Sequence, residues 1–90
     1  MKEIRLNGAK MTDKDTTHAY LKRKLALPDY YGENLDALWD CLSTDFSMKK
    51  IIIKNPEKIA ENLGTYGESL MKIFQEVADV NDCIQVEIEF

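Results

Sequence analysis

Five carboxylates and several aromatic side chains stand in one part of the chain that has no basic residue. Residues 28–48 contain neither Lys nor Arg, and they hold the only tryptophan and two of the four tyrosines. The five acids are Asp29, Glu33, Asp36, Asp40 and Asp45. Carboxylates without nearby cations create a negative field that attracts cationic molecules. The segment therefore indicates a surface that meets a positively charged partner.

Residues 33–42 divide into two faces when they are placed on a helical wheel at about 100° per residue. The apolar face consists of Leu35, Leu38 and Leu42. The acidic face, roughly 150° away, consists of Glu33, Asp36 and Asp40. Trp39 lies at the border, where its ring can pack on the core and leave one edge beside the carboxylates.

The acidic face is costly for a helix. Asp36 and Asp40 form a like-charge pair four residues apart, which costs about 0.2–0.5 kcal/mol. Asp40 also opposes the helix dipole near the carboxyl end, at about 0.3–1 kcal/mol. A merely solvated face is the simplest explanation, but unpaired charges beside aromatic groups favour a binding surface.

An acid–base hydrolase is the competing interpretation, because Asp36, Asp40 and Glu76 could act as a catalytic set if burial separated their pKa values. The chain has no Gly-rich phosphate loop, nucleophile elbow or metal-ligand cluster. We therefore expect no catalysis, no cofactor and no metal site. The single histidine, His18, shares a predicted helix face with Leu21 and Leu25, and we expect it in the core.

Three strands are predicted. Alternating apolar residues favour strands at residues 3–7 and 84–90, and the β-branched run 51–53 favours a buried strand at residues 50–54. Four helices are predicted at residues 12–25, 33–42, 55–64 and 67–79. Their expected end signals are a Thr12 cap, a positive φ at Gly32 before an Asn34 cap, an Asn55 cap, and a stop at Gly64.

Helices between successive strands make parallel crossover connections the natural ones. An apolar pattern on only one face of the outer strands places the helices on one side of the sheet. The predicted fold is therefore a two-layer α/β domain spanning residues 1–90, with a three-stranded parallel sheet and four helices on one face.

The charge distribution limits the classes of partner. The 90 residues carry a net charge of −4, and the only basic excess lies in residues 1–27, so binding of free nucleic acid is disfavoured. No apolar run is long enough to span a bilayer, and the first residues are charged, so we expect a cytoplasmic protein without a membrane segment. Cys41 and Cys83 lack metal-site spacing and are expected to be free packing thiols.

Residues 25–42, LALPDYYGENLDALWDCL, closely resemble the signature of the barstar family, the intracellular inhibitors of secreted bacterial guanyl-preferring ribonucleases. Weaker matches extend the resemblance over the rest of the chain, at His18, Glu68, Ser69, Phe74, Glu76 and Cys83. The family fold has three parallel strands and four helices, in agreement with the architecture expected above.

The resemblance implies a surface that occupies the phosphate sites of a ribonuclease without offering a bond to cleave. It implies Asp40 as the main phosphate mimic, and Asp36 and Glu76 as partners of flanking bases. The other implied contacts, through stacking, close backbone approach, hydrogen bonding and packing, are Tyr30, Gly32, Asn34, Leu35, Trp39 and Ile73. The implied partner is a basic, secreted, guanyl-preferring ribonuclease in a 1:1 complex, with an inhibitor that is monomeric when free.

The chain departs from the family pattern after the acidic helix. Where barstar carries a glycine and a tryptophan, this chain has Ser43-Thr44-Asp45-Phe46, and residues 49–54 are richer in lysine. The departure keeps a second possibility open: a divergent module that binds a different basic partner, such as another nuclease toxin or a regulatory protein.

Overall fold

The computed structural model describes residues 1–90 and contains a three-stranded parallel sheet. The strands are β1 (Lys2–Asn7), β2 (Lys49–Lys54) and β3 (Ile84–Glu89), with β2 in the centre. Lys2, Lys49 and Ile84 stand side by side in the register, so all three strands begin at the same edge. The run of β-branched residues lies in the central strand, which is hydrogen-bonded to a neighbouring strand on each edge. β-Branched side chains pack well in such a buried strand.

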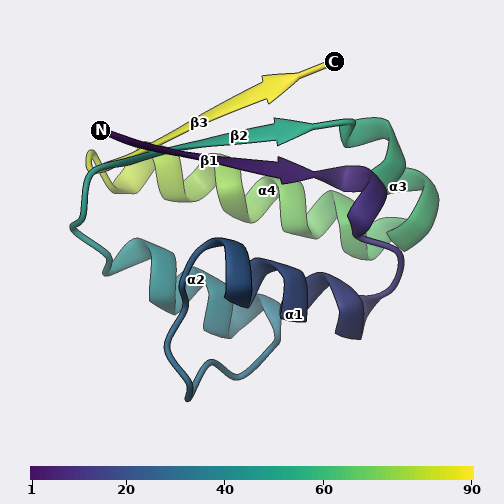
Figure 1. Ribbon diagram of the computed structural model, residues 1–90, viewed down its shortest axis with the longest axis horizontal. Coiled ribbons are helices and arrows are strands. Elements are labelled where there is room, and N and C mark those ends of the chain that lie inside the picture. Colours follow the sequence, from purple (N-terminus) through teal and green to yellow (C-terminus); the bar gives the residue numbers. More distant parts are fainter.

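Four helices accompany this sheet; three of them lie on one of its sides, and α3 lies at the end where β1 and β2 finish (Figure 1). They are α1 (Lys14–Lys24), α2 (Leu35–Ser43), α3 (Pro56–Leu63) and α4 (Thr65–Val80), and a 3-10 turn, η1 (Gly8–Lys10), follows β1. The predicted fold class is confirmed. None of the helices is long and apolar enough to cross a membrane.

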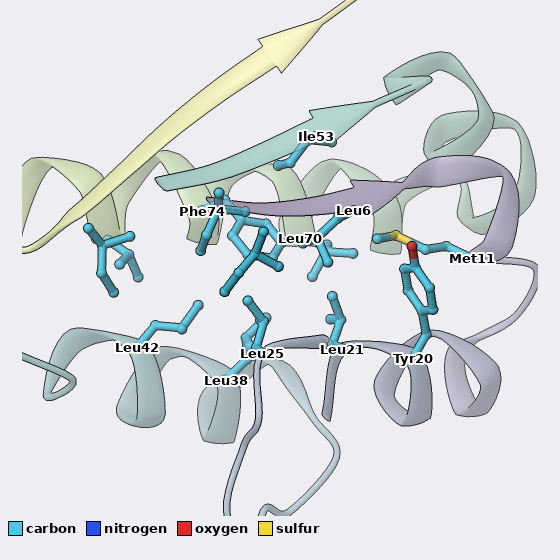
Figure 2. Packing of buried hydrophobic residues seen from close by; sticks show 14 of the residues in the cluster. Leu6, Met11, Tyr20, Leu21, Leu25, Leu38, Leu42, Ile53, Leu70 and Phe74 are labelled. Carbon is cyan, nitrogen blue, oxygen red and sulfur yellow. The ribbon is translucent and has the colours of Figure 1, made fainter. Parts of the chain in front are cut away.

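The core fills the space between the sheet and the helices. In Figure 2, side chains from α1 and α2 point toward side chains of β1, β2 and α4. The fully buried members include Leu6, Leu21, Leu38, Leu42, Ile51, Ile53, Leu70, Phe74 and Val77. The opposite face of the sheet carries no helix. Ile52 of the central strand lies on this face and is nevertheless buried. On the same face, charged side chains of β2 and β3 form the cross-strand ion pairs Lys50–Glu87 and Lys54–Glu89.

One predicted helix cap is wrong, and a second has the predicted position but not the cap hydrogen bond. Asp13, not Thr12, caps α1, and its carboxylate accepts a hydrogen bond from the Thr16 amide at 2.8 Å. A carboxylate at this position also interacts favourably with the helix dipole, which a hydroxyl does not. Asn55 precedes α3 with a left-handed φ of 53° and makes no side-chain cap. Its amide instead donates to Asn7 Oδ1 at 2.8 Å and ties the start of α3 to the end of β1.

Gly64 separates α3 from α4 in a single residue. Its φ of 58° lies in the region that favours glycine, and α4 begins at Thr65 rather than at residue 67 as predicted. The predicted stop at Gly64 is confirmed. Helix α4 follows directly after Gly64 and extends from Thr65 to Val80. It packs against both α2 and α3.

Candidate partner-binding surface

Helix α2 presents two carboxylates on a face turned away from the core. Leu38 and Leu42 are completely buried and hold the helix against the other elements. Asp36 and Asp40 are exposed. The two faces that the wheel predicted are therefore confirmed for these four residues.

Neither Asp36 nor Asp40 has a counter-ion within the molecule. The ion pairs all involve other carboxylates, and the last turn of α2 contains no basic residue. Both carboxylates are thus free to accept hydrogen bonds from another molecule and to form ion pairs with its cationic groups.

The other predicted contact groups on α2 and α4 are apolar or acidic. Leu35 and Trp39 of α2 and Ile73 of α4 are partly buried and pack against the core, so each leaves part of its surface in solvent. Helices α2 and α4 pack together. Glu76 of α4 is exposed and makes a loose pair with Lys72 on its own helix, at 3.8 Å between Nζ and Oε1.

The loop of residues 28–34, here called the recognition loop, joins α1 to α2 and separates two adjacent tyrosines. Tyr31 is buried, with 5% of its surface exposed, and belongs to the core cluster. Tyr30 is 87% exposed, which is unusual for a large aromatic side chain. The fold thus uses one tyrosine to fasten the loop and leaves the other in solvent.

The predicted role of Gly32 in the backbone is wrong. The positive φ before α2 belongs to Glu33, at 53°, and not to Gly32. A Cβ atom at Gly32 would meet only Ala37 Cβ at 3.4 Å and Asn34 Nδ2 at 3.5 Å, which are ordinary contacts. The predicted Asn34 cap is confirmed, with Oδ1 accepting from the Ala37 amide at 2.8 Å. Nothing inside the molecule therefore requires glycine at position 32.

His18 lies in the core beneath the recognition loop, as expected. It is 1% exposed, and both ring nitrogens face tyrosine hydroxyls: Nδ1 lies 2.6 Å from Tyr31 and Nε2 lies 2.5 Å from Tyr66. Burial lowers the pKa of His18, and the negative charges of Glu33 and Asp15 oppose this effect in part. The histidine links α1, the recognition loop and α4.

One of the five acids of residues 28–48 is already neutralised. Asp45 pairs with the buried Lys49 and accepts two hydrogen bonds from Ser47. Burial raises the pKa of Asp45, but the hydrogen bonds from Lys49 and Ser47 outweigh it and hold the pKa below its usual range. The buried amide of Asn81 donates to the carbonyls of Leu42 and Asp45 at 2.9 and 2.8 Å. This network was missed at the sequence level, because Asp45 lies in the connection after α2 and Lys49 begins β2, so no helical spacing relates them.

The segment that contains this network also carries two exposed apolar side chains. Phe46 is 74% exposed and Met48 is 54% exposed, both in the connection from α2 to β2. Large apolar groups on a fastened loop are typical of contact surfaces.

The one hollow in the surface does not coincide with this region. A depression of about 490 Å³ lies along α3 and α4, lined by Pro56, Ala60, Gly67, Glu68, Met71, Lys72 and Gln75. None of the predicted contact residues lines it. The molecule also has no group of three or more His, Cys, Asp or Glu side chains that could hold a metal ion.

Comparison with known proteins covers almost the whole chain. The family model described as Barstar (barnase inhibitor) matches residues 1–89. The chain belongs to the barstar family. It is also 37% identical over 92 residues to the "Putative ribonuclease inhibitor YrdF" of Bacillus subtilis (strain 168), covering 99% of this chain and 100% of that protein. The predicted resemblance is confirmed.

The connection that follows the acidic helix has two features of its own. The exposed Phe46 and the Asp45–Lys49 pair both lie in the segment that the sequence analysis marked as a departure from the family pattern. The acidic face of α2 and the connection from residue 43 to 48 are thus two separate parts of the candidate surface.

Proposed function

We propose that this protein inhibits a basic ribonuclease by inserting the acidic face of α2 and the recognition loop into its active-site cleft. The observation that carries the proposal is that Asp36 and Asp40 are exposed on one helix face with no ion-pair partner. Membership of the barstar family and the name of the Bacillus subtilis relative support it.

The physical basis is that a ribonuclease cleft holds cationic groups arranged for RNA phosphates. A carboxylate on a rigid helix can take a phosphate position without offering a bond to cleave. Asp40 takes the central phosphate position in this proposal, and Asp36 and Glu76 pair with flanking bases. Charge-assisted hydrogen bonds of this kind are about twice as strong as neutral ones.

The remaining contacts are apolar or made by the backbone. Tyr30 offers an exposed ring for stacking, and Leu35, Trp39 and Ile73 offer partly buried apolar surface. Gly32 has no role inside the molecule, which agrees with close approach of a partner to the backbone there. Asn34, already used as the helix cap, is exposed and can form hydrogen bonds with the partner.

Inhibition rather than catalysis agrees with the setting of the carboxylates. Asp36, Asp40 and Glu76 are all exposed, and no enclosed cavity surrounds them, so nothing would exclude water or orient a substrate. The partner in this proposal is a secreted ribonuclease that prefers guanyl sites, bound in a 1:1 complex by a monomeric inhibitor. Binding in the cytoplasm would protect the RNA of the producing cell.

The test is to titrate the protein against a guanyl-preferring secreted ribonuclease and to follow RNA cleavage. Asp40→Ala should weaken inhibition far more than Lys58→Ala or Glu61→Gln, two controls on α3 that change one charge each. The association rate should fall with added salt, because the screening length falls from about 10 Å at 0.1 M to about 3 Å at 1 M. Equal effects of the three substitutions would contradict phosphate mimicry.

A second candidate is a divergent module that binds another basic protein. The observation that favours it is the exposure of Phe46 and Met48 in the connection that departs from the family pattern. If the protein does not inhibit ribonucleases of this type but captures a different nuclease toxin or regulatory protein through Asp36 and Asp40, this candidate holds.

A further inference from the structure

Three elements that are far apart in the sequence meet at His18. The histidine comes from α1, Tyr31 from the recognition loop and Tyr66 from the first turn of α4. The His18 ring stands edge-on to the Tyr66 ring, with centroids 6.0 Å apart and planes at 84°, and is tilted by 52° to the Tyr31 ring at 5.8 Å. The imidazole therefore connects the two phenols by hydrogen bonds at both nitrogens.

The recognition loop has no other hydrogen bond to a side chain outside itself. The Tyr31 amide donates to the Pro28 carbonyl, the Asn34 amide group donates to the Gly32 carbonyl, and Asn34 caps its own helix. Each of these bonds is local. The Tyr31 hydroxyl thus fastens the middle of the loop to the body of the protein, between the proposed contacts Tyr30 and Gly32.

We propose that Tyr66 is a positioning residue for the recognition loop, acting through His18 on Tyr31 and so fixing where Tyr30 and Gly32 stand. The inference rests on the function proposed above, in which these residues contact the partner. Tyr66 does not touch the partner in this scheme; it orients the imidazole, and the imidazole orients Tyr31.

The arrangement fits one protonation state of the histidine. In the neutral ring one nitrogen donates and the other accepts. Tyr31 is buried, so its hydroxyl proton is satisfied when it donates to Nδ1, and Nε2–H then donates to the more exposed Tyr66 oxygen. A protonated ring would donate to both oxygens, and the Tyr31 proton would have no acceptor among the hydrogen bonds of this site.

The charged and titratable groups near the site come from α1, α2, α4 and the recognition loop. Asp15 on α1 and Glu33 in the loop favour the protonated imidazole, whereas burial disfavours it. Burial also raises the pKa of Tyr31 and of Tyr66, and Tyr66, Cys41 and Glu33 act on Tyr31 in the same direction. Lys14 of α1 lies over the Tyr66 ring, 4.6 Å from its centroid. The neutral arrangement therefore prevails above the lowered pKa of His18, and the loop should loosen as the pH falls through that value.

The test compares Tyr66→Phe with the unchanged protein by hydrogen exchange, expressed as protection relative to intrinsic rates. The expected result is a loss of protection of roughly 2- to 10-fold for the Tyr31 amide, which donates to the Pro28 carbonyl, with amides of β2 unchanged. The same variant should bind a guanyl-preferring ribonuclease more weakly by a similar factor. His18→Gln, which donates and accepts but does not titrate, should remove the pH dependence of loop protection that accompanies the titration of His18.

The outcomes separate this inference from the function on which it rests. Unchanged loop protection in Tyr66→Phe, or an equal loss in the loop and in β2, overturns the positioning role. A looser loop with unchanged ribonuclease binding also overturns it. If the unchanged protein fails to bind the ribonuclease while the loop responds as expected, the proposed function fails and the loop fastening stands.

Discussion

Replacing Asp40 with Asn should make the free protein more stable, because the acidic face of α2 is arranged against the stability of its own helix. Asp40 lies in the last turn of α2, and Asp36 lies in the first turn. Neutralising Asp40 removes a like-charge pair, worth about 0.2–0.5 kcal/mol. It also removes an unfavourable charge from the carboxyl end of the dipole, worth about 0.3–1 kcal/mol.

The expected gain for Asp40→Asn is therefore about 0.5–1.5 kcal/mol in the free energy of unfolding at low ionic strength. For a domain of 90 residues this raises Tm by roughly 2–10 °C. Asn and Asp have similar helix propensities, so the change in charge dominates. The Asp40 side chain makes no hydrogen bond or ion pair in the molecule that the substitution would break.

Asp36→Asn is the matched control, since it removes the same repulsion from the opposite end of the helix. Here the lost dipole interaction is favourable, so the net effect lies between a loss of about 0.8 kcal/mol and a gain of about 0.2 kcal/mol. Calorimetric melts of both variants in about 10 mM and 1 M salt measure the difference, which should shrink at high salt because of screening. A lower Tm for Asp40→Asn than for Asp36→Asn at low salt would refute the electrostatic reasoning.

Three further predictions concern the loops and the connection after α2. Gly32→Ala should leave the free energy of unfolding, measured in urea melts, unchanged or higher by roughly 0.4–1 kcal/mol. The same substitution should weaken ribonuclease inhibition by roughly 10-fold, because the added methyl group overpacks the interface. A large loss of stability would show an internal role for Gly32. Ala26, shortly after α1, has a φ of 52°, and Gly64, directly after α3, has a φ of 58°. Ala26→Gly should therefore be neutral or stabilising, and Gly64→Ala should destabilise by about 1 kcal/mol. The opposite order of denaturation midpoints would contradict this. Lys49→Met should destabilise by about 2–3 kcal/mol, because it leaves the partly buried Asp45 carboxylate without a counter-ion. Since the folded pKa of Asp45 lies below its ordinary value of 3.8, the stability due to this pair is fully present above that value and is lost as the pH falls through the folded pKa. Acid melts of Lys49→Met should show a smaller loss, because only the hydrogen bonds from Ser47 then remain. An unchanged acid profile would count against the pair.

The fold and the faces of α2 could be predicted because they depend on periodicity. The spacing of Leu38 and Leu42 determines which side of the helix is buried, and the carboxylates must then lie on the other side. The alternation in β1 and β3 determines the single covered face of the sheet in the same way.

Some details that could not be predicted depend on how a whole loop closes or on contacts between residues far apart in the sequence. Which residue of the recognition loop takes a positive φ is decided by how the whole loop closes between α1 and α2, and that residue is Glu33 instead of Gly32. Asn55 precedes α3 in a left-handed conformation and makes no side-chain cap, and its side-chain amide donates to Asn7, 48 residues earlier. Tyr66 reaches His18 across the same sequence separation of 48 residues. No local pattern carries such information.

The parallel order of the sheet gives the protein a particular response to mechanical load. Strands β1 and β3 run in the same direction and both pair with β2, so the start of β1 and the end of β3 lie at opposite ends of the sheet (Figure 1). A force that pulls these two points apart slides β1 and β3 past β2 in opposite directions. The six residue pairs of each ladder are then loaded together in shear, and not opened one after another. A protein-unfolding machine that pulls one end of the chain while the other end is held would therefore meet its greatest resistance at β2.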